Sequence, residues 1–492
     1  MRTLNTATID DLPNDVSRPR YDRQSVTVGI MHLGVGGFHR AHMAMTLDRL
    51  MNAGKALDWG ICGVGLLPSD KRMDEVLQAQ DCLYTLTLKH PDGHREASVI
   101  GSIVEYLFAP DDVEAVIAKM ASAEVRIVSL TITEGGYNFD RVTGEFDLEN
   151  PGVQADLTPG ATPSTAFGIV TEALRRRRLA GTPAFTVLSC DNIQGNGDMA
   201  QKMFAAFATA KDSDLGEWVK AHVAFPNSMV DRITPVTSDD DIAQAQERTG
   251  LFDAWPVVAE PFFQWVVEDH FPLGRPPLED ADVQMVAEVM PYELMKLRLL
   301  NASHQALCYF GYLSGYRYAH EALSDPLISR FLLRYMNEEA TPTLLPVPGI
   351  NLADYKNQLI ERFSNAEVRD TLARLCAESS DRIPKWLVPV IREQIALGGP
   401  IALSAAIVAS WARYAEGVDE QGNTITVVDN VREDVMAAAS AQRENILAFI
   451  QNRNLFGDLA ENELFANAYA AALVSIFDNG AHAALEAIVQ GE

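Results

Sequence analysis

Basic residues are scarce in this sequence. Of its 492 residues, 40 are Lys or Arg and 67 are Asp or Glu, so the formal net charge is −27. A protein this acidic repels phosphate backbones and anionic membrane surfaces, so we expect neither nucleic acid nor a membrane as a partner. Cysteine is scarce as well. The five cysteines are scattered and odd in number, which fits neither a disulfide framework nor a zinc cluster.

Long hydrophobic runs and metal-binding motifs are also missing. One uncharged run, residues 395–412, reaches the lower length limit for a membrane span, but Gly-Gly-Pro at 398–400 interrupts it. We therefore predict a break followed by a buried helix from Ile401. No H-x-x-x-H, C-x-x-C or H-E-x-x-H motif occurs, and His39 and His42 have no nearby carboxylate pair, so we expect no metal. The N-terminal stretch lacks the apolar segment of a signal peptide, so the expected location is cytoplasmic.

The sequence does contain enough apolar residues, 47%, for a large core, and they follow two patterns. From residue 28 to about 267, short β-branched runs alternate with amphipathic stretches, as in a parallel sheet covered by helices. Residues 83–104 predict a hairpin that turns at Pro91–Gly93. After Pro291 the periodicity is almost entirely helical. We expect an α/β fold with a boundary near 285, giving domains 1–285 and 286–492. The predicted strands are 28–33, 59–65, 125–132, 184–190 and 255–259.

The segment HLGVGGFHRAH, residues 32–42, places glycines between the first predicted strand and a helix. Gly34 and Gly36 begin the G-x-G pattern of dinucleotide loops, in which the backbone and free helix-start amides approach a pyrophosphate. The third glycine of that pattern is missing, so a structural turn is the alternative. Asp70 follows the second strand, where an acid can accept ribose hydroxyls, although it also suits a helix start.

Polar residues or glycines follow four of the predicted strands. Because ligands of doubly wound sheets bind at the carboxyl ends of the strands, one crevice can collect these residues. The four clusters are Gly34 to Arg40, Gly65 to Asp70, Thr133 to Gly135, and Asp191-Asn192.

A second polar group interrupts the apolar helical run at 291–310. With ~100° per residue, Asn301 lies ~140° and His304 ~80° round from Lys296, so all three can share one broad face. A desolvated lysine has a lowered pKa and can take a proton from an alcohol, while asparagine amides stabilise an alkoxide. The alternative is a set of satisfied polar groups at a helix start or domain contact.

Two further sites allow either a functional or a purely structural interpretation. The pair Asp231-Arg232 is either functional or a buried ion pair. Arg374 and Arg382, which flank the sequence CAESSD, either bind a ligand or cap helices.

Seven stretches, in order along residues 30 to 385, resemble the polyol-specific long-chain dehydrogenases. The resemblance implies an N-terminal Rossmann-type doubly wound domain and a mainly α-helical C-terminal domain, with NAD and substrate meeting between them. In this family G-x-G-G-F-H-R replaces the three-glycine loop. The stretches are HLGVGGFHRAH (32–42), ICGVGLLPSD (61–70), TITEGGY (131–137), LSCDNIQGNG (188–197), FPNSMVDRITP (225–235), EPFFQWVVED (260–269) and KLRLLNASHQ (296–305).

The resemblance also implies roles for individual residues. Lys296 would be the general base for a C2 hydroxyl, and Asn192 and Asn301 would hold the reacting oxygen. His304 would hydrogen-bond the substrate, and Glu134 would pass protons between Lys296 and solvent. The other implied contacts are Asp231, Arg374 and Arg382 to substrate hydroxyls, and Gly34, Gly36, Gly37, Phe38, Arg40 and Asp70 to the cofactor.

The expected reaction is a reversible, zinc-independent, NAD-dependent oxidation of D-mannitol at C2 to D-fructose. Alternatives in the family are D-arabinitol 4-dehydrogenase and fructuronate reductase. Hydroxyacid dehydrogenases resembling 6-phosphogluconate dehydrogenase are a further alternative, but they are much shorter. A non-catalytic NAD-responsive regulator would be expected to lose Lys296, Asn301 or Asn192, and all three are present. The family contains monomers, and no heptad seam predicts an oligomer here.

Overall fold

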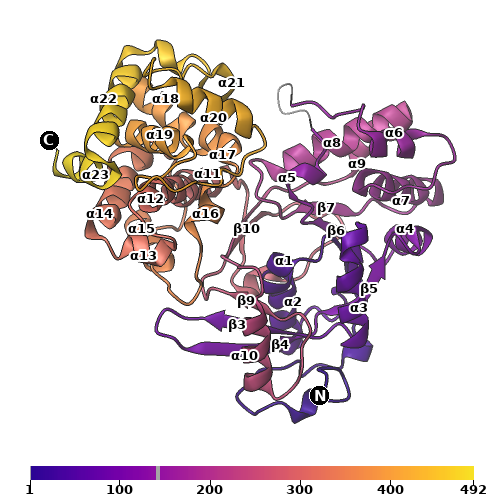
Figure 1. Ribbon diagram of the computed structural model, residues 1–492. Helices are drawn as coiled ribbons and strands as arrows, with labels where there is room; N and C mark the ends of the chain where they lie inside the picture. The colour runs from indigo at the N-terminus through magenta and orange to yellow at the C-terminus, as the bar shows by residue number, and fades with distance from the viewer. Residues whose placement is uncertain (1, 140–143, 492) are drawn as a thin grey trace. The chain divides into compact units, whose positions relative to one another are not determined.

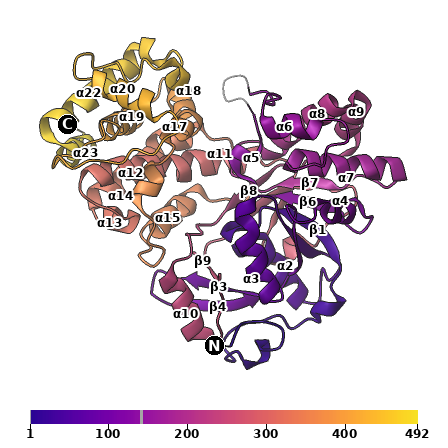
Figure 2. The same cartoon turned by 45° about the vertical axis from the view of Figure 1, so that its right-hand side comes forward.

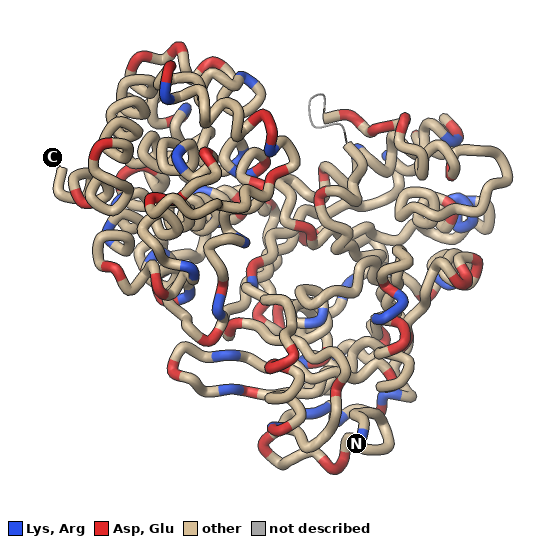
Figure 3. Tube along the Cα trace, in the orientation of Figure 1, with Lys and Arg blue, Asp and Glu red and all other residues tan. Residues whose placement is uncertain are grey.

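The chain divides into two compact units in the computed structural model, which describes residues 2–139 and 144–491. The first unit is Met1–Met290 and the second is Pro291–Glu492, whereas the sequence analysis placed the boundary near 285. Figure 1 shows strands and helices in the first unit and helices in the second. Asp and Glu occur throughout both units (Figure 3), in keeping with the net charge.

The main sheet of the first unit has five parallel strands in the order β5-β2-β1-β6-β7. Four of them confirm predicted strands, and β5 is the strand that the sequence analysis missed. All residues of β2, β6 and β7 are buried, as expected for strands covered on both faces. The strands are β1 (Val28–Leu33), β2 (Gly60–Gly65), β5 (Ile103–Phe108), β6 (Ile127–Leu130) and β7 (Thr186–Ser189).

Helices cover both faces of this sheet, because successive side chains of each strand point to opposite sides. Met31 and Leu33 of β1 join one buried cluster, while Ile30, which directly precedes Met31, joins another. The first cluster includes residues of α4 (Val113–Ala121), α7 (Ala166–Ala180) and α8 (Asn196–Lys211), and the second includes residues of α2 (Met43–Asn52) and α3 (Lys71–Ala79). Figure 2 shows α7, α8 and α9 (Ser213–His222) together beside β7.

Two small sheets complete the first unit. The predicted hairpin is confirmed as β3 (Tyr84–Lys89) and β4 (Arg95–Ile100). The predicted strand at 255–259 forms β9 (Val257–Ala259), but it pairs with β3 and not with the main sheet, so its expected place was wrong. Local alternation identifies a strand without identifying its partner. The other sheet was not predicted; it contains β11 (Gln284–Val286), β10 (Gln264–Glu268) and β8 (Ser228–Asp231).

The second unit is helical, as predicted. Its most buried helices are α12 (Ala302–Leu313) and α19 (Ala402–Tyr414), which pack against each other. The predicted break in the uncharged run is confirmed, because α18 ends at Leu397 and Gly398 has φ +69° before α19 begins. No helix among the described residues is long and apolar enough to cross a membrane. The remaining principal helices are α11 (Met290–Met295), α14 (Pro326–Arg334), α15 (Leu352–Phe363), α16 (Leu372–Cys376), α17 (Ser379–Trp386), α18 (Val388–Leu397), α20 (Arg432–Ala441), α22 (Glu463–Asn479) and α23 (Ala481–Gln490).

Candidate active site

The three glycines of the loop between β1 and α1 (Gly37–Ala41) are glycine for different reasons. Gly34 has φ +92°, and a Cβ there would lie 2.2 Å from the carbonyl oxygen of Thr131, so the backbone itself requires glycine. The nearest atom to a Cβ would be 4.0 Å away at Gly36 and 3.5 Å away at Gly37. Packing therefore explains neither of these two. Open space beside the first turn of a helix is what a dinucleotide pyrophosphate requires of loop glycines.

Buried side chains hold this loop in place. The hydroxyl of Thr131 donates to the carbonyl oxygen of Gly34 over 2.6 Å, and His32 Nε2 also lies 2.9 Å from that hydroxyl. The ring of His39 stacks on His32 with 3.4 Å between the ring centroids. Burial lowers the pKa of His32 to about 3, so its ring is neutral at ordinary pH. The first turn of α1 is thereby fixed against β1.

Arg40 does not point to the space beside the glycines. Its side chain is 1% exposed, and Nη1 donates to the carbonyl oxygen of Trp255 over 2.5 Å. The Tyr84 hydroxyl donates in turn to the carbonyl oxygen of Arg40 over 2.6 Å. Arg40 thus joins α1 to the sheet of β3 and β9, and as placed it supports the loop from inside the protein. Phe38 is half-buried and stacks on His42.

Asp70 lies in the turn that follows β2. Its Oδ2 accepts hydrogen bonds from the amides of Leu66 and Leu67, both over 2.9 Å. This contact gives Asp70 the local role of a helix-start residue. Because it uses a single carboxylate oxygen, it leaves Asp70 able to bind a ribose hydroxyl through the other one.

Glu134 belongs to α5 (Thr133–Gly136), a short helix at the carboxyl end of β6. The preceding Thr133 has φ +64°, which is unusual for a β-branched residue. Asp191 supports this turn by accepting from the amide of Thr133 over 2.8 Å and from the hydroxyl of Tyr137 over 2.9 Å. Burial raises the pKa of Asp191 to about 6, although these donors oppose the shift.

Asn192 is exposed and follows Asp191 at the carboxyl end of β7. The side-chain amide of Asn196 donates through Nδ2 to the carbonyl oxygens of Asp191 over 3.0 Å and Ser228 over 2.8 Å. These bonds tie the end of β7 to β8, whose last residue, Asp231, is 5% exposed. The sequence analysis missed Asn196, because it lies in a polar, glycine-rich turn where no feature of the sequence distinguishes it from its neighbours.

Arg232 connects this region to the glycine loop. Its Nη1 donates to the carbonyl oxygen of Ala41, at the end of α1, over 2.7 Å, and its Nε donates to the carbonyl oxygen of Glu260 over 3.0 Å. The guanidinium is buried and held by main-chain oxygens. Arg232 therefore fixes the end of β8 relative to α1.

In the second unit, Lys296 and Asn301 begin and end a π-helical turn, which we call the lysine π-turn (Lys296–Asn301). The assumption of a regular α-helix at this point was wrong. The amide of Ala302 donates to the carbonyl oxygen of Leu297, five residues back. In such a wide turn, Asn301 lies about one full turn after Lys296, and not ~140° further round as in an α-helix. Lys296 and Asn301 are each 7% exposed, and His304 is 8% exposed.

Several cations surround His304. Burial lowers its pKa well below the usual value, and Arg374, Arg362, Arg382 and Lys296 lower it further through their charges. His304 is therefore neutral and can donate or accept a hydrogen bond. Its ring lies 4.4 Å from that of Phe363, measured between centroids. Arg362 and Phe363, which end α15, were missed because they fit the pattern of an ordinary amphipathic helix.

The two arginines predicted near this group have clear local partners. Arg374 forms a bidentate ion pair with Asp370, with both contacts 2.6 Å long. Arg382 Nη1 donates to the carbonyl oxygen of Leu375, in the last turn of α16, over 2.9 Å. Arg382 thus performs the helix-capping role that was the alternative, and both arginines still lie close enough to His304 to lower its pKa.

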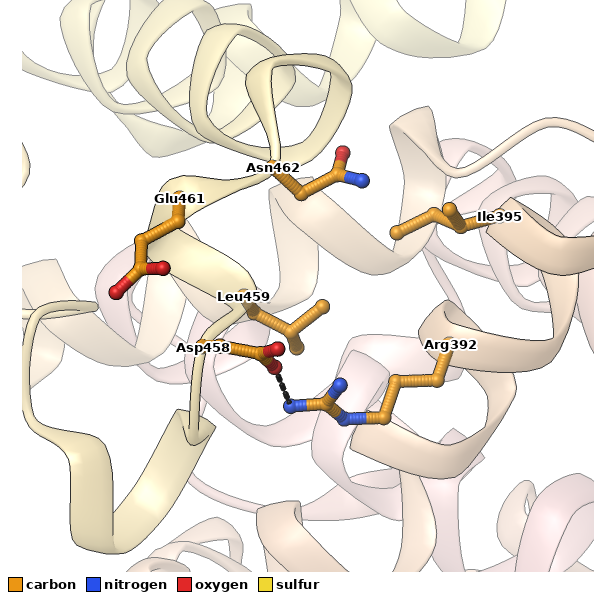
Figure 4. A pocket seen from close by; sticks show the side chains of 6 residues that line it. All are labelled: Arg392, Ile395, Asp458, Leu459, Glu461 and Asn462. Carbon is orange, nitrogen blue, oxygen red and sulfur yellow. Dashed lines mark hydrogen bonds and ion pairs between the residues drawn. The ribbon is translucent and has the colours of Figure 1, made fainter.

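Hollows outside these groups contain none of the predicted residues. The one in Figure 4 has a volume of about 300 Å³ in the second unit, and an ion pair crosses it, with Arg392 Nη2 2.6 Å from Asp458 Oδ1. Another, of about 370 Å³ in the first unit, is lined by the ion pair of Lys89 and Asp241. Among the described residues, no group of three or more His, Cys, Asp or Glu side chains is arranged to hold a metal ion.

Comparison with known proteins extends these observations to the whole chain. Residues 28–280 match the mannitol dehydrogenase Rossmann domain, and residues 288–477 match the mannitol dehydrogenase C-terminal domain. Mannitol 2-dehydrogenase of Pyrenophora tritici-repentis is 46% identical over 488 residues, which are 98% of this chain and 85% of that protein.

Two solved structures are similar over almost their full lengths. The ternary complex of Pseudomonas fluorescens mannitol 2-dehydrogenase with NAD and D-mannitol has a TM-score of 0.91 and 45% identity, and the match covers 100% of both chains. D-sorbitol dehydrogenase in a substrate-free form has a TM-score of 0.90 and 39% identity, with 99% of this chain and 100% of that chain covered.

Proposed function

The chain belongs to the mannitol dehydrogenase family, and from that premise we propose that it interconverts D-mannitol and D-fructose with NAD. It is an NAD-dependent oxidoreductase that acts on a CH–OH group. The observation that carries the choice of substrate is the full-length similarity to the ternary complex with NAD and D-mannitol. The glycine loop fits the cofactor, since Gly36 and Gly37 leave open the space that a Cβ would fill.

The proposed cofactor contacts follow from this fit. Gly34, Gly36 and Gly37 shape the loop for the pyrophosphate, and Phe38 lies in the first turn of α1 beside it. Asp70 binds the adenosine ribose through the carboxylate oxygen that the turn leaves available. Arg40 contributes indirectly, by holding α1 to the neighbouring sheet.

Lys296 is proposed as the general base that takes the proton of the C2 hydroxyl. NAD, when bound, accepts the hydride that leaves C2. Asn192 and Asn301 hold the reacting oxygen as it becomes a carbonyl, because amide N–H groups stabilise an alkoxide. The Oδ1 atom of Asn301 is buried without a hydrogen-bond partner among the described residues, so a substrate hydroxyl would satisfy it.

The remaining groups position the substrate and move the proton. Neutral His304 donates a hydrogen bond near the reacting carbon, and Asp231, Arg374 and Arg382 hold the other hydroxyls. Glu134, in the turn supported by Asp191, exchanges the proton of Lys296 with solvent.

The test is NADH formation by the purified protein after EDTA treatment, with D-mannitol, D-sorbitol and D-arabinitol compared. The reverse reaction is followed with D-fructose and fructuronate. Efficient turnover of mannitol and fructose in chelator is expected, because Lys296 replaces a metal in activating the hydroxyl. Preference for D-sorbitol would favour the second candidate, which the similarity to D-sorbitol dehydrogenase supports. Loss of activity on chelation would overturn the lysine mechanism.

We also propose that the protein is a cytoplasmic monomer. All five cysteines are buried free thiols, which suits a reducing compartment. The net charge of −27 opposes self-association through mutual repulsion. Light scattering coupled to size-exclusion chromatography should give the monomer mass of 54.0 kDa, and a dimer mass would contradict this part of the proposal.

A further inference from the structure

A second π-helical turn packs against the lysine π-turn. This tyrosine π-turn (Tyr335–Ala340) follows α14 and contacts the lysine π-turn directly. π-Turns are rare in proteins, and they occur frequently at functional sites. Two of them in contact suggest that one stabilises the other.

The contact involves a carbonyl group that the π-turn deprives of its α-helical donor. In an α-helix the amide of Ala302 would donate to the carbonyl oxygen of Arg298, four residues back. Here that amide donates to Leu297. The hydroxyl of Tyr335 instead donates to the carbonyl oxygen of Arg298, over 3.1 Å. Tyr335 is 0% exposed, and burial raises its pKa well above the usual value, so the hydroxyl keeps its proton.

We propose that Tyr335 is a positioning residue, whose hydroxyl holds the lysine π-turn in the conformation that presents Lys296 and Asn301 together. Tyr335 touches neither substrate nor cofactor in this account. It acts through the main chain of Arg298, midway between the two catalytic side chains. The inference rests on the function proposed above, because it assigns Lys296 and Asn301 to the reaction.

The surroundings make the tyrosine π-turn a rigid support. The carboxylate of Glu339 accepts from the amides of Leu403 and Ser404, both over 2.7 Å, which fixes the turn to the first residues of α19. The Arg298 side chain is also anchored, with two contacts of 2.7 Å to Glu393. The Tyr335 hydroxyl is thus held between fixed elements. Removing it would increase the mobility of the lysine π-turn and leave the packing of the neighbouring helices largely unchanged.

The experiment compares Tyr335→Phe with Tyr469→Phe. Tyr469 is also fully buried, and its hydroxyl donates to Gln442 over 3.3 Å, so the control removes a similar group without touching the lysine π-turn. Small misplacements of catalytic groups reduce rates up to ~100-fold, so we expect kcat of Tyr335→Phe to fall roughly 10- to 100-fold. The KM for NAD should stay unchanged, and the primary isotope effect with C2-deuterated D-mannitol should rise. The control should match the wild type in all three.

A second readout does not depend on turnover. Amide hydrogen exchange of residues 296–303 should be faster in Tyr335→Phe than in the wild type and in Tyr469→Phe. Equal exchange and equal kinetics in the two variants would overturn the inference and leave the proposed function intact. A wild type that oxidises no polyol would refute the function, and hydrogen exchange would still decide the role of Tyr335.

Should Tyr335→Phe fail to fold, Glu339→Gln takes its place. This variant weakens the hold of α19 on the tyrosine π-turn and keeps the tyrosine. A smaller fall in kcat with faster exchange at 296–303 would support the inference. Wild-type values in both measurements would overturn it.

Discussion

Alanine substitutions in the glycine loop can distinguish a glycine that the backbone conformation requires from a glycine that cofactor binding requires. At Gly34, alanine would adopt φ +92°, which costs about 1–2 kcal/mol, and its Cβ would collide with the carbonyl oxygen of Thr131 at 2.2 Å. Relief of such a collision costs about 1–3 kcal/mol more. Gly34→Ala should therefore lower the melting temperature of the unliganded protein by roughly 5–15 °C, given ~2–4 °C per kcal/mol for a unit of this size.

At Gly36 the same change should leave stability almost untouched. The backbone has φ −107°, and the nearest atom to the new methyl group lies 4.0 Å away. A substitution without collision or strain changes stability by within about 0.5 kcal/mol. The methyl group would occupy the space assigned to the pyrophosphate, however, and overpacking of about 1–3 kcal/mol corresponds to roughly 5- to 150-fold weaker NAD binding.

Thermal unfolding without ligand and calorimetric titration with NAD measure the two effects. Gly93→Ala at the tip of the β3–β4 hairpin is the matched control, since Gly93 has φ +84° with nothing near a Cβ. It should show the strain of a positive φ alone and normal NAD affinity. Unchanged NAD affinity in Gly36→Ala would refute the assignment of the loop. Equal melting of Gly34→Ala and Gly93→Ala would refute the collision at Thr131.

Three other outcomes are expected. Lys296→Ala should lower kcat by several powers of ten while NAD affinity stays nearly normal in titration, and a near-normal rate would remove the base assignment. Asp70→Ala should weaken NAD binding and reduce discrimination against NADP in initial-rate assays, and an unchanged preference would leave Asp70 only its turn-forming role. The folded-state pKa of Asp191 is raised from 3.8 to about 6, so its contribution to stability is present below pH ~4 and is lost as the pH rises through 6, by at most about 3 kcal/mol. The stability advantage of the wild type over Asp191→Asn in denaturant titrations should shrink across that interval, and a constant difference would contradict the raised pKa.

The fold was predictable where local patterns alone determine it. Runs such as VGIMHL in β1 are apolar and β-branched, and they lie between turn signals, so they identify buried parallel strands. The pairing of β9 with β3 was not predictable, because three consecutive buried residues carry no information about their neighbour in the sheet. The same limit applies to β8, β10 and β11, which are short and pair across long stretches of the chain. Their order depends on tertiary contacts that a single sequence does not encode locally.

The site was predictable in residue type and much less so in geometry. Polar residues on an apolar helix indicate a candidate functional group, and Lys296, Asn301 and His304 were singled out in this way. A period of 3.6 residues, however, assumes hydrogen bonds between residues four apart, and the π-turn replaces them with bonds between residues five apart. The residue associated with that change lies outside the segment. The hydroxyl of Tyr335 donates a hydrogen bond to the carbonyl oxygen of Arg298, which the π-turn leaves without its α-helical donor.

Arg40 is a residue whose type suggested a ligand contact and whose position in the structure gives it a supporting role. The family resemblance implies that Arg40 contacts the cofactor. The structure buries the guanidinium against Tyr84 and Trp255, where it satisfies a main-chain oxygen and joins two sheets through α1. Desolvating a guanidinium inside a protein is tolerated only with such partners. Arg40 therefore contributes rigidity to the loop, and we propose that glycine at 36 and 37 provides the space for the cofactor.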